Sequence, residues 1–188
     1  MPTMMPPTLH LPLLDATTAD LFFQRLLAEG NWRQYQLNLY GRTVTEPRLI
    51  DWAGAVTYRY SGRVLEPRPL SPLLCSLREQ VERTLGMRFN HVLINRYRDG
   101  NDYMGWHRDN EPELGSDPTI ASLSLGQARP FQMRTLAKTD PHEWLLESGS
   151  LFVMQPGCQR YWQHQLPKRA LSRIPGERIN LTFRQVQT

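Results

Sequence analysis

The stretch RINLTFR, residues 178–184, alternates polar and apolar side chains without a break. Successive side chains of a β-strand point to opposite faces, so this pattern predicts a strand with one apolar and one polar face. The apolar face would carry Ile179, Leu181 and Phe183, and the polar face would carry Arg178, Asn180, Thr182 and Arg184. We expect the apolar face to pack against a second layer or a helix.

Two arginines on one face restrict where that face can lie. If both point into the interior of a barrel, their burial requires anionic partners. A bound dicarboxylate would supply these partners through charge-assisted hydrogen bonds. The alternative is an edge strand whose arginines lie in water. The segment NRY follows the interior pattern, because Asn95 and Tyr97 would share one face as hydrogen-bond donors.

The remaining pattern predicts two helices followed by short strands. The first helix would begin at Asp15 and stop at Gly30, and the second would begin at Ser71 and stop at Gly86. The apolar face of the first helix would contain Leu21, Phe22, Leu26 and Leu27. The predicted strands are VLINRY, IASLSL, FQMRT, EWLLE, SLFVMQ and RINLTFRQV. This order predicts a mainly β (α+β) fold, either a sandwich or a jelly roll, braced by the helices.

Length and composition favour one domain outside a membrane. A chain of 188 residues is long enough for a single sizeable core. No apolar run approaches the roughly 18 residues that span a membrane, and the start MPTMMPPTLHLPLLD lacks the basic flank of a secretory signal. Cys75 and Cys158 form no CxxC pair, so we expect free thiols and a cytoplasmic protein, or a nuclear one in a eukaryote.

The charge balance permits a nucleic-acid partner. The formal net charge is +4 and the pI is near 9.3. Lys138 and Lys168 are the only lysines among 22 basic residues, and the others are arginines. Arginine suits phosphates and base edges, although a coding bias would produce the same excess. A moderately basic domain therefore allows nucleic-acid binding without requiring it.

The stretch WHRDNEPE, residues 106–113, contains the tripeptide HRD, which occurs in two unrelated chemistries. A protein kinase needs an asparagine five residues after this aspartate, and here that position is Leu114. The chain also lacks a glycine-rich loop upstream and a DFG segment downstream. The kinase interpretation therefore fails, which leaves a metal site or a solvated turn.

Two side chains of HRD can serve as metal ligands. In an extended segment His107 and Asp109 would share a face, as residues i and i+2 do. Two histidines and one carboxylate form the facial triad of non-haem iron(II) enzymes. His164 in the aromatic segment YWQHQLP is the best third ligand. Of the other histidines, His10 falls in the N-terminal tail, His91 begins a strand, and His142 follows Pro141 in an expected turn.

Four segments together resemble the AlkB family of Fe(II)- and 2-oxoglutarate-dependent dioxygenases, most strongly the homologues that repair alkylated DNA. They are LINRYRDGNDYMGWHRDNEPE, IASLSLGQARPFQMR, GSLFVM and RINLTFRQ. The resemblance runs from about Leu37 to Val186 in the order of the family. It implies a double-stranded β-helix (jelly roll) over about residues 90–186 and a nucleotide-recognition lid over about 37–65. The whole domain would be residues 15–188, after a tail of residues 1–14.

The resemblance also implies roles for individual residues. His107, Asp109 and His164 match the iron ligands of the family. The positions that match binding of 2-oxoglutarate are Asn95, Tyr97, Arg178, Asn180, Thr182 and Arg184. With O2, family chemistry converts the cosubstrate to succinate and CO2 and hydroxylates an N-methyl group. The product then releases formaldehyde.

The implied partner is alkylated DNA, duplex or single-stranded, with RNA as an open alternative and a monomer as the expected state. Substrates such as 1-methyladenine and 3-methylcytosine pair poorly and are cheaper than normal bases to flip into a pocket. Glu111 resembles the carboxylate that faces the damaged base. Tyr58 and Tyr60 resemble aromatic lid residues, of which Tyr60 would stack on the cationic base. The segment containing Leu39, Tyr40 and Gly41 resembles a finger that fills the space left by a flipped base. Strand alternation alone would also explain the two lid tyrosines.

Several positions depart from the family pattern or have no assigned role. Asn110 and Pro112 replace residues that are commonly charged, and Trp106 stands where a smaller or polar residue is expected. Arg129 and Arg134 are both candidates for a further pocket arginine of the family. We expect the departures at Asn110, Pro112 and Trp106 to affect pocket size and lesion preference rather than the metal site.

Two rival functions remain open. The first is a dioxygenase of the same family that acts on a protein side chain, a lipid or a small molecule. The second is a non-catalytic nucleic-acid-binding module on the same fold. The basic balance and the Tyr40 segment argue against the first, and the intact set of ligands and arginines argues against the second.

Overall fold

Two antiparallel sheets form the body of the protein. The computed structural model describes residues 4–39 and 41–187. The larger sheet contains, in spatial order, β1 (Thr8–Pro12), β12 (Ser150–Met154), β9 (Ile120–Gly126), β14 (Arg178–Arg184), β7 (His91–Tyr97) and β4 (Leu49–Gly54). The smaller sheet contains β11 (His142–Leu146), β10 (Arg129–Thr135), β13 (Trp162–Leu166) and β8 (Met104–His107). Facing antiparallel sheets of this kind confirm the predicted mainly β jelly roll.

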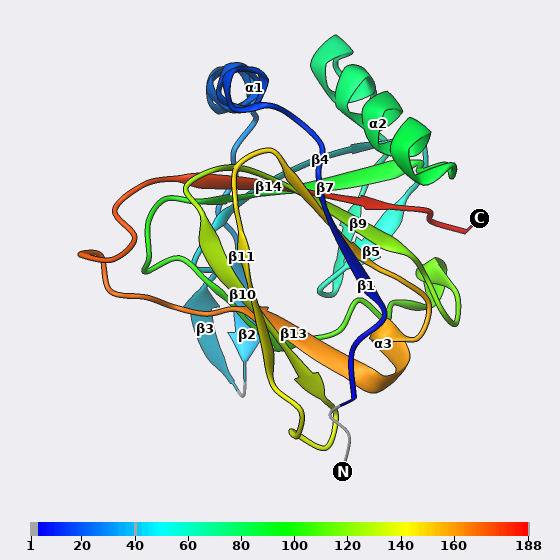
Figure 1. Ribbon diagram of the computed structural model, residues 1–188, viewed down its shortest axis with the longest axis vertical. Helices are drawn as coiled ribbons and strands as arrows, with labels where there is room; N and C mark the ends of the chain where they lie inside the picture. The colour runs from blue at the N-terminus through cyan, green and yellow to red at the C-terminus, as the bar shows by residue number, and fades with distance from the viewer. Residues whose placement is uncertain (1–3, 40, 188) are drawn as a thin grey trace.

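The helices cover the outer face of the larger sheet. Figure 1 shows α1 (Ala16–Glu29) and α2 (Pro72–Leu85) on the side of β14, β7 and β4 that faces away from the smaller sheet. Two shorter helices, η1 (Pro112–Leu114) and α3 (Cys158–Tyr161), lie in the connections. The predicted caps are confirmed, because the side chains of Asp15 and Ser71 accept from the backbone N–H groups of Thr18 and Leu74. Gly86 ends α2 with φ 65°, a left-handed conformation that favours glycine.

The apolar face of β14 is the base of the main core. Ile179, Leu181 and Phe183 are fully buried in a cluster that also contains Leu77 of α2 and Phe23 of α1. This confirms that the apolar half of RINLTFR packs against helices. One expectation for α1 was wrong: Leu21 is 57% exposed, and the neighbouring Phe23 takes the buried position. The helix is rotated so that Ala19, Phe23 and Leu26 face the sheet.

The space between the two sheets holds a second, mixed core. Its apolar members include Leu93 of β7, Met133 of β10 and Trp162 of β13. The polar half of RINLTFR faces the same space, since Arg178, Asn180, Thr182 and Arg184 are all buried in a sheet whose other face is apolar. The interior of the barrel is therefore polar along one strand.

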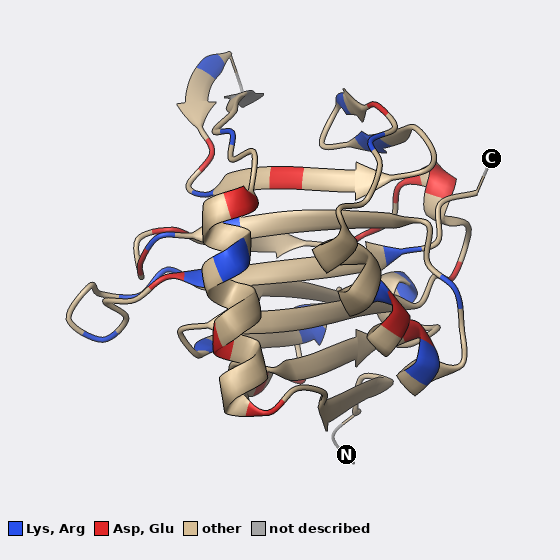
Figure 2. Cartoon of the chain, turned by 90° about the horizontal axis from the view of Figure 1, so that it is seen from above, with Lys and Arg blue, Asp and Glu red and all other residues tan. Residues whose placement is uncertain are grey.

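The expected N-terminal tail, the expected turn at His142 and the expected lid region all contain strands. Residues 8–12, expected in the N-terminal tail, form the edge strand β1, which pairs with β12. His142, expected in a turn, is the first residue of β11. The expected lid region contains two hairpins, β2 (Gln36–Leu39) with β3 (Arg42–Thr45), and β5 (Tyr58–Tyr60) with β6 (Arg63–Leu65). Figure 2 shows both hairpins beyond β4, at one edge of the larger sheet, with basic residues on each.

Among the helices of the described residues, none is both long enough and apolar enough to cross a membrane.

The packing of the helices on β9 gives a stability prediction. Leu123 is fully buried in the main core, whereas Leu145 of β11 is 54% exposed. Leu123→Ala should lower the free energy of unfolding by about 2–5 kcal/mol, because it leaves a cavity. The matched variant Leu145→Ala should change it by less than about 0.5 kcal/mol. Urea unfolding measures both, and equal effects would contradict the assigned core.

Candidate active site

His107, Asp109 and His164 converge on one point between the sheets. His107 ends β8 and lies directly opposite His164 of β13, with the ring centroids 4.2 Å apart. Oδ1 of Asp109 lies 3.6 Å from Nε2 of His107 and 3.9 Å from Nε2 of His164. One ligand atom from each residue falls within 4.8 Å of the others. Pairing of β8 with β13 therefore brings together residues that are 55 or more positions apart.

The three side chains are in the protonation state that a metal requires. His107 donates from Nδ1 to the carbonyl of Gly105 at 2.8 Å, which leaves the lone pair of Nε2 free. Burial lowers the pKa of His107 and lowers the pKa of His164 to about 3, so both rings are neutral. Burial opposes ionisation of Asp109, but the positive charge of Arg184 is the main influence against it, and the pKa lies at about 2. Two neutral imidazoles and a carboxylate fit a divalent metal.

Two further residues hold Asp109 in position. Arg184 donates from Nη2 to Oδ2 of Asp109 at 2.7 Å, and both side chains are 3% exposed. Gln159 of α3 accepts the backbone N–H of Asp109 on its Oε1 at 2.9 Å. Sequence reasoning missed Gln159, because it lies 50 residues from Asp109 and has no distinctive spacing. The result is a carboxylate with one oxygen fixed by a cation and the other directed to the histidines.

A single cavity joins the triad to the polar face of β14. The cavity is lined by all nine residues expected to bind metal or cosubstrate: Asn95, Tyr97, His107, Asp109, His164, Arg178, Asn180, Thr182 and Arg184. The register explains this, since Arg178 pairs with Tyr97 and Asn180 with Asn95 across β14 and β7. Tyr60, Ser122 and Phe131 complete part of the wall.

The two arginines serve opposite ends of this cavity. They are six positions apart on an extended strand, so their Cα atoms are separated by roughly 20 Å along β14. Arg178 lies at the Tyr97 end and donates to Oγ of Ser124 at 2.9 Å, and burial lowers its pKa to about 10. Arg184 lies at the metal end. Nε of Arg178 and both Nε and Nη1 of Arg184 have no hydrogen-bond partner among the described residues. Such buried cationic donors fit an anionic carboxylate at each end.

Arg48 links the cavity to the lid and was not anticipated from the sequence. It donates from Nε to Oδ1 of Asn95 at 3.1 Å and from Nη2 to the hydroxyl of Tyr60 at 3.3 Å. Glu46 lies 3.6 Å from the same guanidinium and is held in turn by Arg63 at 2.9 Å. Arg48 is 4% exposed, so it is a buried bridge between a lid tyrosine and a cavity asparagine.

The expected substrate residues fall into two groups. Tyr58 and Tyr60 are buried on β5, with the guanidinium of Arg184 within 6 Å of both rings. Glu111 follows the triad, and burial together with Asp109 raises its pKa. Gly41 has φ 76° in the turn between β2 and β3, and the backbone of Leu39 ends β2. Tyr40 lies outside the described residues.

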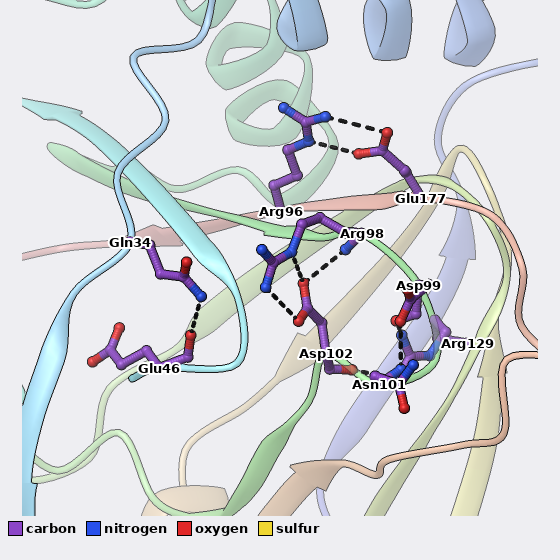
Figure 3. Close-up of polar contacts among 9 residues, drawn as sticks. All are labelled: Gln34, Glu46, Arg96, Arg98, Asp99, Asn101, Asp102, Arg129 and Glu177. Atoms are coloured by element: carbon purple, nitrogen blue, oxygen red, sulfur yellow. Dashed lines mark hydrogen bonds and ion pairs between the residues drawn. The ribbon is translucent and has the colours of Figure 1, made fainter. Parts of the chain in front are cut away.

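Arg129 and Arg134 lie on one strand but differ in their contacts. Arg129 is fully buried and donates to three backbone carbonyls, those of Asp99, Asp102 and Pro167, at 2.9–3.0 Å. Figure 3 shows it beside the loop after β7, where Arg98 forms a paired contact with Asp102. Arg134 instead stacks on Trp106 at 3.9 Å. Arg129 therefore links the loop after β7 to the segment after β13.

A family comparison agrees with this geometry. Residues 8–184 match the family model described as the 2OG-Fe(II) oxygenase superfamily. The chain is 39% identical over 190 residues to alpha-ketoglutarate-dependent dioxygenase alkB homolog 3 of Rattus norvegicus, covering 95% of this chain and 63% of that protein. It is 35% identical over 187 residues to DNA oxidative demethylase ALKBH2 of Homo sapiens, covering 93% of this chain and 71% of that protein. The chain belongs to the 2OG-Fe(II) oxygenase superfamily, among its AlkB homologues.

The chain covers only part of some relatives, and it also matches a solved structure. The chain spans less than two thirds of the length of the alkB homolog 3 proteins of rat and human, 63% and 65%. A solved structure entitled "The structure of OsALKBH1" matches with a TM-score of 0.67 at 16% identity, over 97% of this chain and 98% of that one. This match supports the fold. The family description names iron(II) and 2-oxoglutarate, and the residues of the cavity fit both groups.

The different contacts of the two arginines on β10 give a prediction. Arg129→Met would leave three carbonyls of two loops without their donor, so the free energy of unfolding should fall by about 3 kcal/mol or more. Arg134→Met removes one stacking contact at a half-buried position and should cost less than about 1 kcal/mol. Urea unfolding of both variants tests this, and a milder effect at Arg129 than at Arg134 would refute the assignment.

Proposed function

We propose that this protein is an Fe(II)- and 2-oxoglutarate-dependent dioxygenase that removes alkyl groups from nucleic-acid bases. One observation carries the proposal. The His107, Asp109 and His164 triad and the polar face of β14 line the same buried cavity. A metal triad alone would fit many kinds of protein. Here two buried arginines with unpaired N–H donors lie in the same cavity, and a small dianion bound next to the metal would provide their anionic partners.

The metal ligands would be His107, Asp109 and His164. Bound iron(II), with 2-oxoglutarate and O2, supplies the oxidising power. The chain contributes the preparation of the ligands: Gly105 fixes the tautomer of His107, and Arg184 orients the carboxylate of Asp109. Such outer contacts typically change metal affinity or activity 10- to 100-fold when they are removed.

The cosubstrate would lie along β14. We assign its far carboxylate to Arg178, with the hydroxyl of Tyr97 as a further donor at that end. Its metal-proximal carboxylate would meet the free Nε and Nη1 of Arg184. Asn95, Asn180 and Thr182 line the cavity between these ends, so they would contact the middle of the molecule.

The substrate would be an N-alkylated base, such as 1-methyladenine or 3-methylcytosine, in DNA, with RNA as an open alternative. These bases are cationic, and Glu111 offers a carboxylate beside the triad. The aromatic ring of Tyr60, a lid residue with Tyr58, would stack on a flipped base. Leu39, Tyr40 and Gly41 would form the finger, with Tyr40 as the wedge. Hydroxylation of the N-methyl carbon yields a hemiaminal, whose C–N bond breaks to release formaldehyde and the repaired base.

The relatives support this substrate class over the rival one. One relative is named a DNA oxidative demethylase, and the net charge of +4 favours a polyanionic partner. A dioxygenase that acts on a protein, lipid or small molecule would share the metal site and the cosubstrate cavity. It would not need the basic hairpins that lie beyond β4.

The test is mass spectrometry of a single-stranded oligonucleotide that contains 3-methylcytosine, incubated with protein, Fe(II), 2-oxoglutarate and air. We expect loss of the methyl group, together with succinate and formaldehyde. Asp109→Ala should lower the rate at least about a hundredfold, while the matched variant Leu145→Ala should retain it. Turnover of 2-oxoglutarate without demethylation of any methylated oligonucleotide would favour the rival substrate. Full activity in Asp109→Ala would contradict the ligand assignment.

A further inference from the structure

Beyond the metal and the cosubstrate cavity, one end of the barrel contains a cluster of polar atoms without partners. The hydroxyl of Tyr58, both ring nitrogens of His91 and Oε2 of Glu111 lack hydrogen bonds within the described part of the chain. His91 is 2% exposed and Tyr58 is fully buried. Buried polar groups nearly always have partners, so a cluster of this kind indicates a place where a ligand supplies them.

His91 has a defined position in this cluster. It is the first residue of β7 and pairs across the sheet with Arg184 of β14 and Gly54 of β4. Asn95 and Tyr97 share its face of the strand, so the side chain of His91 points into the barrel at the metal end. The imidazole meets the ring of Tyr58 edge-on, with centroids 4.9 Å apart and an angle of 65°. Glu111 lies two positions after the triad residue Asp109 in the chain.

The sheet is built to accommodate this imidazole. A Cβ atom at Gly54 would approach Cδ2 of His91 to 2.7 Å and a backbone carbonyl to 2.9 Å, so only glycine fits beside it. Burial and the nearby Arg184 lower the pKa of His91 to about 3, and the ring is therefore neutral near pH 7. A neutral imidazole offers one donor and one acceptor. His91 is absent from the group of residues that could hold a metal, which contains His107, Asp109 and His164 alone among the residues described.

We propose that His91 is a specificity-determining residue that hydrogen-bonds the edge of the target base, in a polar wall formed with Tyr58 and Glu111. This inference rests on the proposed function. The three side chains provide an acceptor carboxylate, a donor hydroxyl and an imidazole with one of each, which complements the mixed donors and acceptors of a nucleobase edge. Along β7 the cosubstrate residues Tyr97 and Asn95 come first, and His91 follows at the metal end, where a substrate must present its alkyl group.

The chemistry of the two lesions predicts which of them loses more activity when the hydrogen bond from His91 is removed. Both carry an amino group on one side of the methylated nitrogen, which suits the carboxylate of Glu111. On the other side 3-methylcytosine has a carbonyl oxygen, whereas 1-methyladenine has a C–H group. A donor on His91 can therefore serve the cytosine lesion and has no counterpart on the adenine lesion. Loss of one such hydrogen bond corresponds to a change of roughly three- to tenfold.

The test compares His91→Phe with wild type on two single-stranded oligonucleotides of the same sequence, one with 3-methylcytosine and one with 1-methyladenine. Phenylalanine keeps a flat ring and removes both nitrogens. We expect kcat/KM for 3-methylcytosine to fall roughly three- to tenfold more than for 1-methyladenine. The KM for 2-oxoglutarate should be unchanged, and the thermal midpoint should be equal or higher, because no buried nitrogen is left without a partner. His91→Gln, which retains a donor and an acceptor, should restore part of the preference.

Four results would overturn the proposal. An unchanged ratio of the two kcat/KM values in His91→Phe would mean that His91 only fills space, and a shift in favour of 3-methylcytosine would contradict the assigned donor. If His91→Phe fails to fold, the ratio of the two kcat/KM values is measured with His91→Gln and His91→Leu instead. Equal ratios in these two variants would refute the proposed role of His91. Wild-type protein that demethylates neither oligonucleotide would instead refute the proposed function, and this inference with it.

Discussion

The contact between Arg184 and Asp109 joins the two halves of the barrel. Nη2 of Arg184 on the larger sheet lies 2.7 Å from Oδ2 of Asp109, and both side chains are 3% exposed. Asp109 follows β8, an edge strand of the smaller sheet. Removing one member of such a buried pair leaves an uncompensated charge and typically costs 3–5 kcal/mol. The contact therefore fixes the carboxylate, and with it the distance from Asp109 to His107 and His164.

The same constraint explains why the barrel has a polar interior. β14 lies between β9 and β7 in the larger sheet, and both of its faces are buried. Its apolar face packs against α1 and α2. Burial of its polar face would be unfavourable without hydrogen-bond partners for the polar side chains. Some partners come from the chain, as when Ser122 and Ser124 accept from Asn180 and Arg178. The nitrogens of Arg178 and Arg184 that have no partner among the described residues are those assigned to the carboxylates of the cosubstrate.

The alternation of RINLTFR and the caps at Asp15 and Ser71 are local signals, which is why the sequence could predict β14 and both long helices. The triad could be predicted because His107 and Asp109 are close in sequence and few histidines compete for the third place. Arg48, Gln159 and His91 could not, because their roles depend on contacts 47 or more residues away or on the space beside Gly54. Likewise, β1 forms only because β12 presents an edge to it. Such pairings leave no periodic pattern in the sequence.

The central claim is that the polar face of β14 holds a dianion next to the metal, and ligand-dependent stability tests it most directly. Thermal unfolding of wild type and Arg178→Gln would be followed with Mn(II) alone, with 2-oxoglutarate alone and with both. A ligand that binds the folded state raises its stability by linkage. We predict that both proteins gain stability from Mn(II), and that wild type alone gains more when 2-oxoglutarate is added to it. A wild-type midpoint that does not respond to 2-oxoglutarate in the presence of Mn(II), or an equal response in Arg178→Gln, would contradict the account.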